Sequence, residues 1–309
     1  MKSNITPFER MLKISDALNA NIYVKRDDLY PFTGGGSKAR KLKYILNDNN
    51  IKKYNAIVTA GSNQSNHLRV TALYAAKLGW KLICVVHDIK PDIYEGNLRI
   101  VQLAGAEIRF VQMAEVRQAM DKAMNDLRNK GYTPLYIWGG GHCLEGSFAY
   151  YEAIKELNNQ LEGIIPDYIF IASGTGTTQA GIEIGVRQFL PNCKVIGISI
   201  SRPAKRGKGI ILESMQELNS YLNCPIVMPY DITFDDRWMG NGYASAYPEL
   251  IKTIKWAAKT EGLILDPTYT GKAFHALKMY IEKKELEPDS CIIFWHTGGL
   301  INLLASKQI

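Results

Sequence analysis

The stretch Thr33-Gly-Gly-Gly-Ser-Lys-Ala-Arg-Lys41 is the most informative part of this 309-residue chain. Its three glycines remove side-chain bulk directly before Lys38, at what we expect to be the start of a helix. A lysine forms a Schiff base only where its amine can lose a proton, which requires burial or nearby cations. Lys41, one turn further on, can supply such a cation or contact a phosphate group. The stretch therefore predicts a lysine presented to a ligand, whereas a lone lysine is by default a solvated surface residue.

A second loop of small residues, Ser173-Gly-Thr-Gly-Thr-Thr178, directly follows a hydrophobic strand and opens a predicted helix. Glycines let the backbone approach an anion, and N–H groups and threonine hydroxyls then donate to it. A dinucleotide fingerprint is excluded because Gln179 stands at its third glycine position, and no Gly-Lys-Ser/Thr ending marks a nucleotide P-loop. The phosphate of a smaller cofactor is the best functional interpretation, and a plain strand-to-helix turn is the alternative.

Further small or polar loops follow other predicted strands, where ligands of open parallel sheets bind. Gly61-Ser-Asn-Gln-Ser-Asn-His67 places a run of hydroxyl, amide and imidazole groups where a helix N-cap needs only one. Taken alone, His67 is more typical of a structural hydrogen-bonding residue than of a catalyst. Four other loops share this character, at residues 139–143, 240–243, 266–272 and 296–299.

Short apolar segments alternate with helix-length segments, which predicts β-α-β units, a parallel sheet and right-handed crossovers. We expect strands at residues 56–59, 82–86, 108–111, 135–138, 168–172, 194–199 and 291–295. We expect helices near residues 64–78, 97–104, 114–130, 178–188, 210–222, 248–261 and 270–284. The pattern favours two α/β units that share a cleft: a smaller one of residues 46–152, and a larger one of residues 1–45 and 153–309.

The composition is that of a soluble globular protein. No apolar run approaches ~18 residues, so we expect no membrane span, and residues 1–7 lack the apolar core of a secretory signal. The formal charge of +7 comes from scattered lysines and arginines, which favours a solvated surface or an anionic ligand over nucleic-acid binding. The five cysteines lie far apart, which indicates a reducing cytoplasm and neither a disulfide framework nor a metal site. Those in or beside apolar strands are expected to be buried thiols: Cys84, Cys193 and Cys291.

In their order, these segments resemble the fold type II pyridoxal-phosphate enzymes, and within them the 1-aminocyclopropane-1-carboxylate deaminase and D-cysteine desulfhydrase family. The match runs nearly end to end. Its most specific segments are Ile22-Tyr-Val-Lys-Arg-Asp-Asp-Leu29, Gly35-Gly-Ser-Lys-Ala-Arg-Lys-Leu42, Gln64-Ser-Asn-His67, Gly174-Thr-Gly-Thr-Thr-Gln-Ala-Gly181, Leu265-Asp-Pro-Thr-Tyr-Thr-Gly-Lys272 and His296-Thr-Gly-Gly-Leu300. The resemblance implies two three-layer α/β/α domains with mostly parallel sheets, the larger of which binds pyridoxal 5'-phosphate.

The resemblance also implies catalytic roles. Lys38 would hold the cofactor as a Schiff base and move the Cα proton of the substrate. Ser65 would contact the substrate and act as a base or nucleophile, and Tyr243 and Tyr269 would face the substrate. Asn66 and His67 are also expected to bind substrate, and His142 is expected to be either a changed substrate contact or a bystander.

For the cofactor, the resemblance implies a second set of contacts. Asn66 would hydrogen-bond its phenolic oxygen, and Thr270 would lie near its pyridine nitrogen. His296 and Thr297 would line the ring. The phosphate would be held near Lys41 by the loop residues Gly174, Thr175, Gly176, Thr177 and Thr178.

Three positions depart from parts of this family and bear on the reaction. Cyclopropane-opening deaminases carry glutamate where this chain has Thr270, and a neutral partner weakens the electron sink and suits α,β-elimination. Ser37 replaces a usual asparagine, and His142 lies where Gly-Gly-Ser-Asn is usual. The favoured function is thus a pyridoxal-phosphate lyase acting on a small amino acid such as D-cysteine.

Several alternatives stay open at this point. The enzymatic ones are cyclopropane deamination, β-replacement and racemisation. The other is a binding or regulatory protein that kept the fold and lost turnover. By analogy with the family, a cytoplasmic homodimer is expected.

Overall fold

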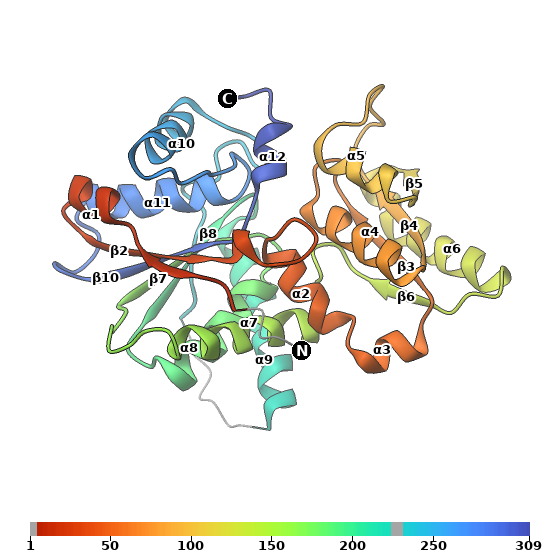
Figure 1. Ribbon diagram of the computed structural model, residues 1–309, viewed down its shortest axis with the longest axis horizontal. Helices are drawn as coiled ribbons and strands as arrows, with labels where there is room; N and C mark the ends of the chain where they lie inside the picture. Colours follow the sequence, from red (N-terminus) through yellow and green to blue (C-terminus); the bar gives the residue numbers. More distant parts are fainter. Residues whose placement is uncertain (1–4, 224–230) are drawn as a thin grey trace.

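Two mostly parallel sheets form the framework of the computed structural model, which describes residues 5–223 and 231–309 (Figure 1). The expectations for residues 1–4 and for Cys224 lie outside the described residues. The larger sheet has the order β1-β2-β10-β7-β8-β9, and only β1 runs antiparallel to its neighbour. Its strands are β1 (Phe8–Arg10), β2 (Asn21–Arg26), β10 (Cys291–His296), β7 (Tyr168–Ser173), β8 (Lys194–Ser199) and β9 (Thr233–Asp235).

The smaller sheet is wholly parallel, in the order β5-β4-β3-β6. Helices α4 and α5 cover one of its faces, and α6 covers the other (Figure 1). The strands are β3 (Ala56–Gly61), β4 (Lys81–Val86), β5 (Glu107–Phe110) and β6 (Pro134–Ile137), and the helices are α4 (Asn66–Leu78), α5 (Gly96–Leu103) and α6 (Val116–Asn129).

Helices also cover both faces of the larger sheet, because successive strand residues point to opposite sides. In β7, Tyr168 and Phe170 pack with α1, α10 and α11, whereas Ile169 and Ile171 pack with α7 and α8. Helix α9 then packs on α8. These helices are α1 (Leu12–Leu18), α7 (Leu144–Asn158), α8 (Thr177–Phe189), α9 (Ala204–Leu222), α10 (Pro248–Glu261) and α11 (Thr270–Glu282). The predicted α/β class with mostly parallel sheets is confirmed.

Short elements complete the chain. They are the 3₁₀ turns η1 (Asp27–Leu29) and η2 (Met113–Glu115), and the helices α2 (Ser37–Ile45), α3 (Asp48–Lys53) and α12 (Leu300–Leu304). Every predicted strand and helix is found, with most ends within a few residues; α9 begins six residues before the predicted start at residue 210. The expected buried thiols Cys84, Cys193 and Cys291 are buried.

Helix α7 is the largest element that the sequence analysis did not predict. It packs against α2, α8 and α9, so its apolar residues face several directions and leave no clear one-sided stripe. The division into domains stays a prediction. Residue 152 falls inside α7, and because α7 packs with helices of the larger sheet, we propose that the smaller domain ends before Leu144.

A buried ionic network fixes α2 to the larger sheet. Arg40 on α2 lies 2.7 Å from Asp27 and 2.7 Å from Glu156 of α7, measured between Nη and carboxylate oxygens. Lys25 of β2 places its Nζ 2.5 Å from Glu156, and its side chain is fully buried. The network holds the beginning of α2, and therefore Lys38, in a fixed position between β2 and α7.

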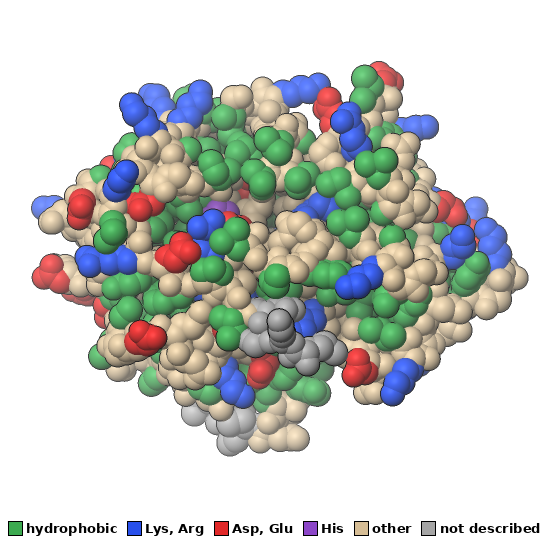
Figure 2. Space-filling model, viewed as in Figure 1, with side chains coloured by type: hydrophobic (Ala, Val, Ile, Leu, Met, Phe, Trp, Pro, Cys, Tyr) green, Lys and Arg blue, Asp and Glu red, His purple; other side chains and the backbone are tan. Residues whose placement is uncertain are grey.

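The surface carries both charge signs without segregation in the view of Figure 2, where basic and acidic side chains are interspersed. Among the described residues, none of the helices is both long enough and apolar enough to cross a membrane.

Candidate active site

Lys38 lies at the start of α2, where the backbone of this helix meets the loop after β10. The N-cap residue Gly36 has a φ of +93°, and an added Cβ would lie 3.0 Å from the carbonyl oxygen of Thr297. The Ser37 N–H donates to that same oxygen over 2.8 Å. Only glycine accepts both the φ value and the close approach, so the predicted glycine stretch brings α2 against the loop that follows β10.

Two lysines of α2 have a lowered pKa and no carboxylate partner among the residues that the structure describes. Burial lowers the pKa of Lys38 to about 8, and its Nζ lies 3.3 Å from the Ser37 hydroxyl. Burial and the charge of Lys38 hold the pKa of Lys41 well below its usual value. Within the described residues the Lys41 Nζ has no hydrogen-bond partner, although only 1% of the side chain is exposed. A buried amine without a hydrogen-bond partner indicates that an anion binds beside it. Lys38 is half-buried and is therefore accessible to a ligand.

The predicted phosphate loop joins β7 to α8. Gly176 is the N-cap of α8 with a φ of +87°, and no side chain within residues 5–223 and 231–309 caps the helix. The first turn of an α-helix has N–H groups without intrahelical partners, which together with the helix dipole attract an anion. The buried Ser173 hydroxyl at the end of β7 also has no partner among the described residues. The loop therefore fits a phosphate group.

The loop of residues 139–143 lies between Lys41, the charged neighbour of Lys38, and the phosphate loop. An added Cβ on Gly141 would lie 3.6 Å from Cδ of Lys41, and one on Gly140 would lie 2.8 Å from Cγ2 of Thr175. The ring of His142 reaches Thr177, with 2.7 Å between Nδ1 and Oγ1. Lys38 and the phosphate loop thus lie on the same side of the molecule. The contact found for His142 is to this loop, whereas the sequence analysis expected a substrate contact.

The polar run after β3 is partly structural. Ser65 is the N-cap of α4, and its Oγ accepts a hydrogen bond from the Leu68 N–H over 3.3 Å. Asn66 accepts a hydrogen bond at Oδ1 from the Asn97 amide over 3.2 Å, which leaves its own NH₂ group free to donate. The Ser65 hydroxyl hydrogen likewise stays free for a ligand.

His67 makes a structural contact. Its Nε2 lies 2.8 Å from the Thr59 hydroxyl of β3, and it is buried. Burial and the two lysines of α2 lower its pKa to about 3, so the imidazole is neutral at physiological pH. This agrees with the interpretation of His67 as a structural hydrogen-bonding residue; its substrate role stays a prediction.

Tyr243 and Tyr269 form a hydroxyl pair, with 2.5 Å between their oxygens. The Tyr243 hydroxyl also lies 3.1 Å from Oγ of Ser62, so the pair bridges a loop of the larger sheet and the loop after β3. Lys272 fixes the loop before Tyr243 by donating to the carbonyl oxygens of Met239 and Gly242, each over 2.7 Å.

Asp266 holds the two predicted residues that begin α11. Its carboxylate accepts the N–H of Tyr269 over 2.9 Å and the N–H of Thr270 over 3.0 Å. The Thr270 hydroxyl donates to Asp266 Oδ1 over 2.8 Å and accepts from the Asp266 N–H over 3.0 Å. Thr270 is therefore a fixed neutral group whose hydroxyl hydrogen is already engaged.

His296, the last residue of β10, makes structural contacts. Its Nε2 donates to the Ile264 carbonyl oxygen over 2.8 Å, and its Nδ1 accepts from the Gly298 N–H over 3.3 Å. Thr297 contributes the carbonyl oxygen that receives the Ser37 N–H. Both residues lie beside the start of α2, as the resemblance implies, and their contact with a cofactor ring stays a prediction.

Ser62, Asn97, Asp266 and Lys272 are supporting residues that the sequence analysis did not single out. Asp266 and Lys272 lie inside the quoted segment Leu265-Asp-Pro-Thr-Tyr-Thr-Gly-Lys272, so its pattern contained a signal for them. Ser62 likewise lies inside the quoted segment Gly61-Ser-Asn-Gln-Ser-Asn-His67, but its role comes from its contact with Tyr243. The role of Asn97 comes from its contact with Asn66.

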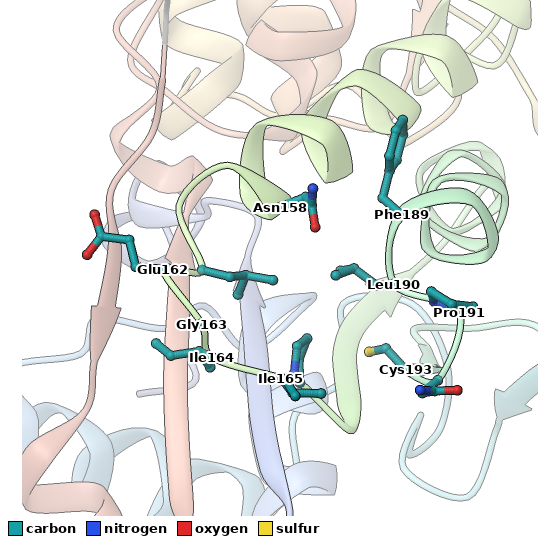
Figure 3. Close-up of a pocket in the computed structure, with 12 residues that line it drawn as sticks. Asn158, Glu162, Gly163, Ile164, Ile165, Phe189, Leu190, Pro191 and Cys193 are labelled. Atoms are coloured by element: carbon teal, nitrogen blue, oxygen red, sulfur yellow. The ribbon is translucent and has the colours of Figure 1, made fainter.

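A hollow of about 410 Å³ lies elsewhere, between the end of α7 and the turn after α8 (Figure 3). Its walls include Ile165, Phe189 and Cys193. These residues lie before β7 and β8 or at the end of α8, so the hollow is at the amino ends of the strands. Open parallel sheets bind ligands at the carboxyl ends, and we therefore propose that the active site lies at Lys38.

Comparisons with known proteins agree with this geometry. Residues 3–298 match the family model described as "Pyridoxal-phosphate dependent enzyme". D-cysteine desulfhydrase of Yersinia enterocolitica is 33% identical, over 98% of this chain and 93% of that protein. D-cysteine desulfhydrase of Klebsiella pneumoniae is 31% identical, over 97% and 93%. A crystal structure described as an ACC deaminase homologue superposes with a TM-score of 0.88 and is 30% identical, covering 97% of this chain and 92% of that one.

The chain belongs to the family of pyridoxal-phosphate-dependent enzymes. The residues present fit this cofactor, because an accessible amine of lowered pKa, an orphaned buried amine and an uncapped helix start lie together. Its cofactor is pyridoxal 5'-phosphate.

Proposed function

We propose that this enzyme is a lyase that catalyses α,β-elimination on a small amino acid, with D-cysteine as the first substrate to test. The observation that carries the proposal is the placement of Lys38 on the same side of the fold as the α8 cradle, with the neutral Thr270 in the matching segment. The relatives described as D-cysteine desulfhydrases support the choice of substrate.

The bound cofactor spreads the negative charge that develops at the substrate Cα, so that a β-substituent such as thiolate can depart. The protein decides which bond breaks. Lys38 holds the cofactor and moves the Cα proton through its Nζ. This role fits a pKa of about 8, because a fraction of the amine is neutral near physiological pH.

Ser65, Asn66 and the tyrosine pair bind the substrate in this proposal. Tyr243 and Tyr269 lie in contact with each other, and Tyr243 contacts the loop after β3, so in this proposal they close one side of the site. Closure excludes water and keeps the reacting groups in place. Of the predicted substrate residues, His67 and His142 make contacts that point to supporting roles.

Thr270 favours elimination over ring opening. A carboxylate beside the pyridine nitrogen keeps that nitrogen protonated, whereas a hydroxyl whose hydrogen is engaged by Asp266 carries no charge to do so. Elimination tolerates this weaker stabilisation, since the leaving group carries off the charge.

The purified enzyme tests the proposal with D-cysteine, L-cysteine and 1-aminocyclopropane-1-carboxylate in parallel. We expect sulfide, ammonia and a keto acid in equal amounts from D-cysteine. Formation of 2-oxobutyrate from the cyclopropane compound, without sulfide from D-cysteine, would show that the favoured reaction is wrong. Turnover of none of the three, in a protein that still binds the cofactor, would favour a regulatory protein.

The association of the cofactor should depend on pH through Lys38. Because only the neutral amine attacks the aldehyde, the yellow colour should form faster as pH rises through about 8 and then level off. Stopped-flow absorbance after adding pyridoxal 5'-phosphate to the cofactor-free enzyme measures this rate. A rate that does not change across this range would contradict the assignment of Lys38.

Gly176→Ala should weaken cofactor binding. A side chain at a φ of +87° costs about 1–2 kcal/mol, and its Cβ would lie 3.1 Å from Cγ1 of Ile211. We expect the dissociation constant of pyridoxal 5'-phosphate to rise by about tenfold, measured by absorbance titration. Gly209→Ala on α9 is the matched control, because none of the described residues lies within 4 Å of its added Cβ. An equal loss of cofactor affinity in both variants would argue against a phosphate site at the start of α8.

We further propose that the enzyme is a cytoplasmic homodimer. The cysteines of known placement are free thiols, which suits a reducing compartment, and the family usually forms dimers. Light scattering during size-exclusion chromatography would show a mass near twice 34.7 kDa if this is correct.

A further inference from the structure

His142 is the one predicted substrate residue whose contact leads to the phosphate cradle. Its Nδ1 lies 2.7 Å from Oγ1 of Thr177, which is the first residue of α8. Its loop is packed tightly on the cradle, since added Cβ atoms on Gly140 and Gly146 would lie 2.8 Å and 3.3 Å from Cγ2 of Thr175 and Thr177. The imidazole is therefore held against the loop on which the anion is expected to bind.

The charges around His142 come from three other elements. Lys41 of α2 and Arg202, which follows β8, are cationic neighbours, and Glu213 of α9 is an anionic one. Arg202 itself donates to the carbonyl oxygen of Gly174 in the cradle. Without an anion, burial and then the two cations lower the pKa of His142 below its usual value.

The orphaned amine of Lys41 is an independent sign that an anion completes this cluster. Its Nζ is buried without a hydrogen-bond partner in the described part of the chain, beside the loop that carries His142. A dianion at the start of α8 would satisfy this amine and would also attract a proton to the imidazole.

We propose that His142 belongs to the phosphate site and takes up a proton when the dianionic phosphate of the cofactor binds. This inference rests on the proposed location of the cofactor and assigns His142 to the phosphate instead of to the substrate. Nδ1–H donates to Thr177 Oγ1, which leaves the Thr177 hydroxyl hydrogen free to donate to the anion. His142 is in this sense a positioning residue, and its protonation is thermodynamically linked to anion binding.

The linkage has a definite sign. If the anion raises the pKa of His142, the protein binds more protons with the anion than without it. The affinity for a dianion therefore rises as pH falls through the range in which His142 titrates, and a shift of one pKa unit corresponds to about a tenfold change in affinity.

Sulfate is a suitable probe because it stays dianionic between about pH 5.5 and pH 8, where histidine titrates. The chain has five histidines, so a histidine-selective ¹H–¹³C NMR spectrum of the cofactor-free enzyme is simple, and the signal missing in His142→Asn assigns His142. We expect the midpoint of this signal to rise by about one pH unit on saturation with sulfate, and again with pyridoxal 5'-phosphate. An unchanged midpoint with both anions would overturn the proposal.

Calorimetry of sulfate binding gives a second readout that needs no turnover. Between pH 5.5 and pH 8 the wild type should lose several-fold more affinity than His142→Asn, with about tenfold as the limit for a shift of one pKa unit. The two lysines of α2 contribute equally to both proteins and cancel in the comparison. Identical pH profiles would contradict the proposal.

If His142→Asn does not fold, His142→Gln replaces it in both experiments. Because neither experiment uses D-cysteine, a failed elimination assay and a failed linkage are distinguishable.

Discussion

Lys38→Ala should lower the rate of sulfide release from D-cysteine by at least about 10³-fold, because one amine serves both to hold the cofactor and to move the Cα proton. Lys41 is the neighbouring amine on α2, and its side chain is buried. It cannot replace Lys38 as the residue that holds the cofactor unless the helix moves. The measurement is a steady-state sulfide assay with saturating cofactor, together with the absorbance of the purified variant.

Lys43→Ala is the matched control for this experiment. Lys43 lies on the same helix and is half-buried, but it is not one of the proposed active-site residues. We expect its activity to stay close to that of the wild type. A Lys38→Ala variant that is yellow and turns over D-cysteine at the wild-type rate would show that another lysine is the catalytic one.

Asp27→Asn should destabilise the fold by about 3–5 kcal/mol, the usual result of removing one partner of a buried ion pair. The substitution keeps the size of the side chain but leaves Arg40, which is 3% exposed, facing a neutral amide. Tyr150 also loses a charged acceptor, since its hydroxyl donates to Asp27 over 2.7 Å. The free energy of unfolding from urea titrations measures the effect.

This loss should depend on pH in a definite direction. Burial acts to raise the pKa of Asp27, but Arg40 and the hydrogen bonds outweigh it and hold the pKa below its usual value. The carboxylate therefore stabilises the fold above the unfolded pKa of about 3.9, and this stabilisation is lost as pH falls through the lower folded value. The difference in the free energy of unfolding between the wild type and Asp27→Asn should therefore become smaller at acidic pH.

Asp126→Asn is the matched control for the network. Its partner is Arg109 at 2.7 Å, but about a third of the Asp126 side chain is exposed. Exposed pairs contribute about 0–1 kcal/mol. Equal destabilisation by the two substitutions would mean that the network around α2 has no special role in holding Lys38.

The regular alternation of strands and helices made most of the larger and smaller sheets predictable from the sequence. Strand β2 was not predicted as a strand because Lys25 and Arg26 give it a charged appearance. In the fold Lys25 is fully buried, since Glu156, far away in the sequence, neutralises it. Helix α7 was not predicted because it is buried on more than one side.

In the candidate site, too, residues marked by a local sequence pattern were predictable, whereas contacts between distant residues were not. Lys38 and the phosphate loop were predictable because glycines and small residues mark them locally. The hydrogen bond between Ser62 and Tyr243 joins residues 181 positions apart, and no local pattern predicts it. His142 was assigned to the substrate by its loop, and only its contact with Thr177 shows that it lies against the phosphate cradle.

The central claim is that pyridoxal 5'-phosphate is bonded to the amine of Lys38. Borohydride reduces the carbon–nitrogen double bond of this link to a stable single bond, so the modified lysine can be found by peptide mass spectrometry of the reduced holoenzyme. Among the described residues, three other buried lysines have a lowered pKa: Lys25, Lys41 and Lys272. Because Lys25 is paired with Glu156, Lys41 and Lys272 are the competitors. The account predicts one pyridoxyl group per chain on Lys38, and a pyridoxyl group on Lys41 or Lys272, or none at all, would contradict it.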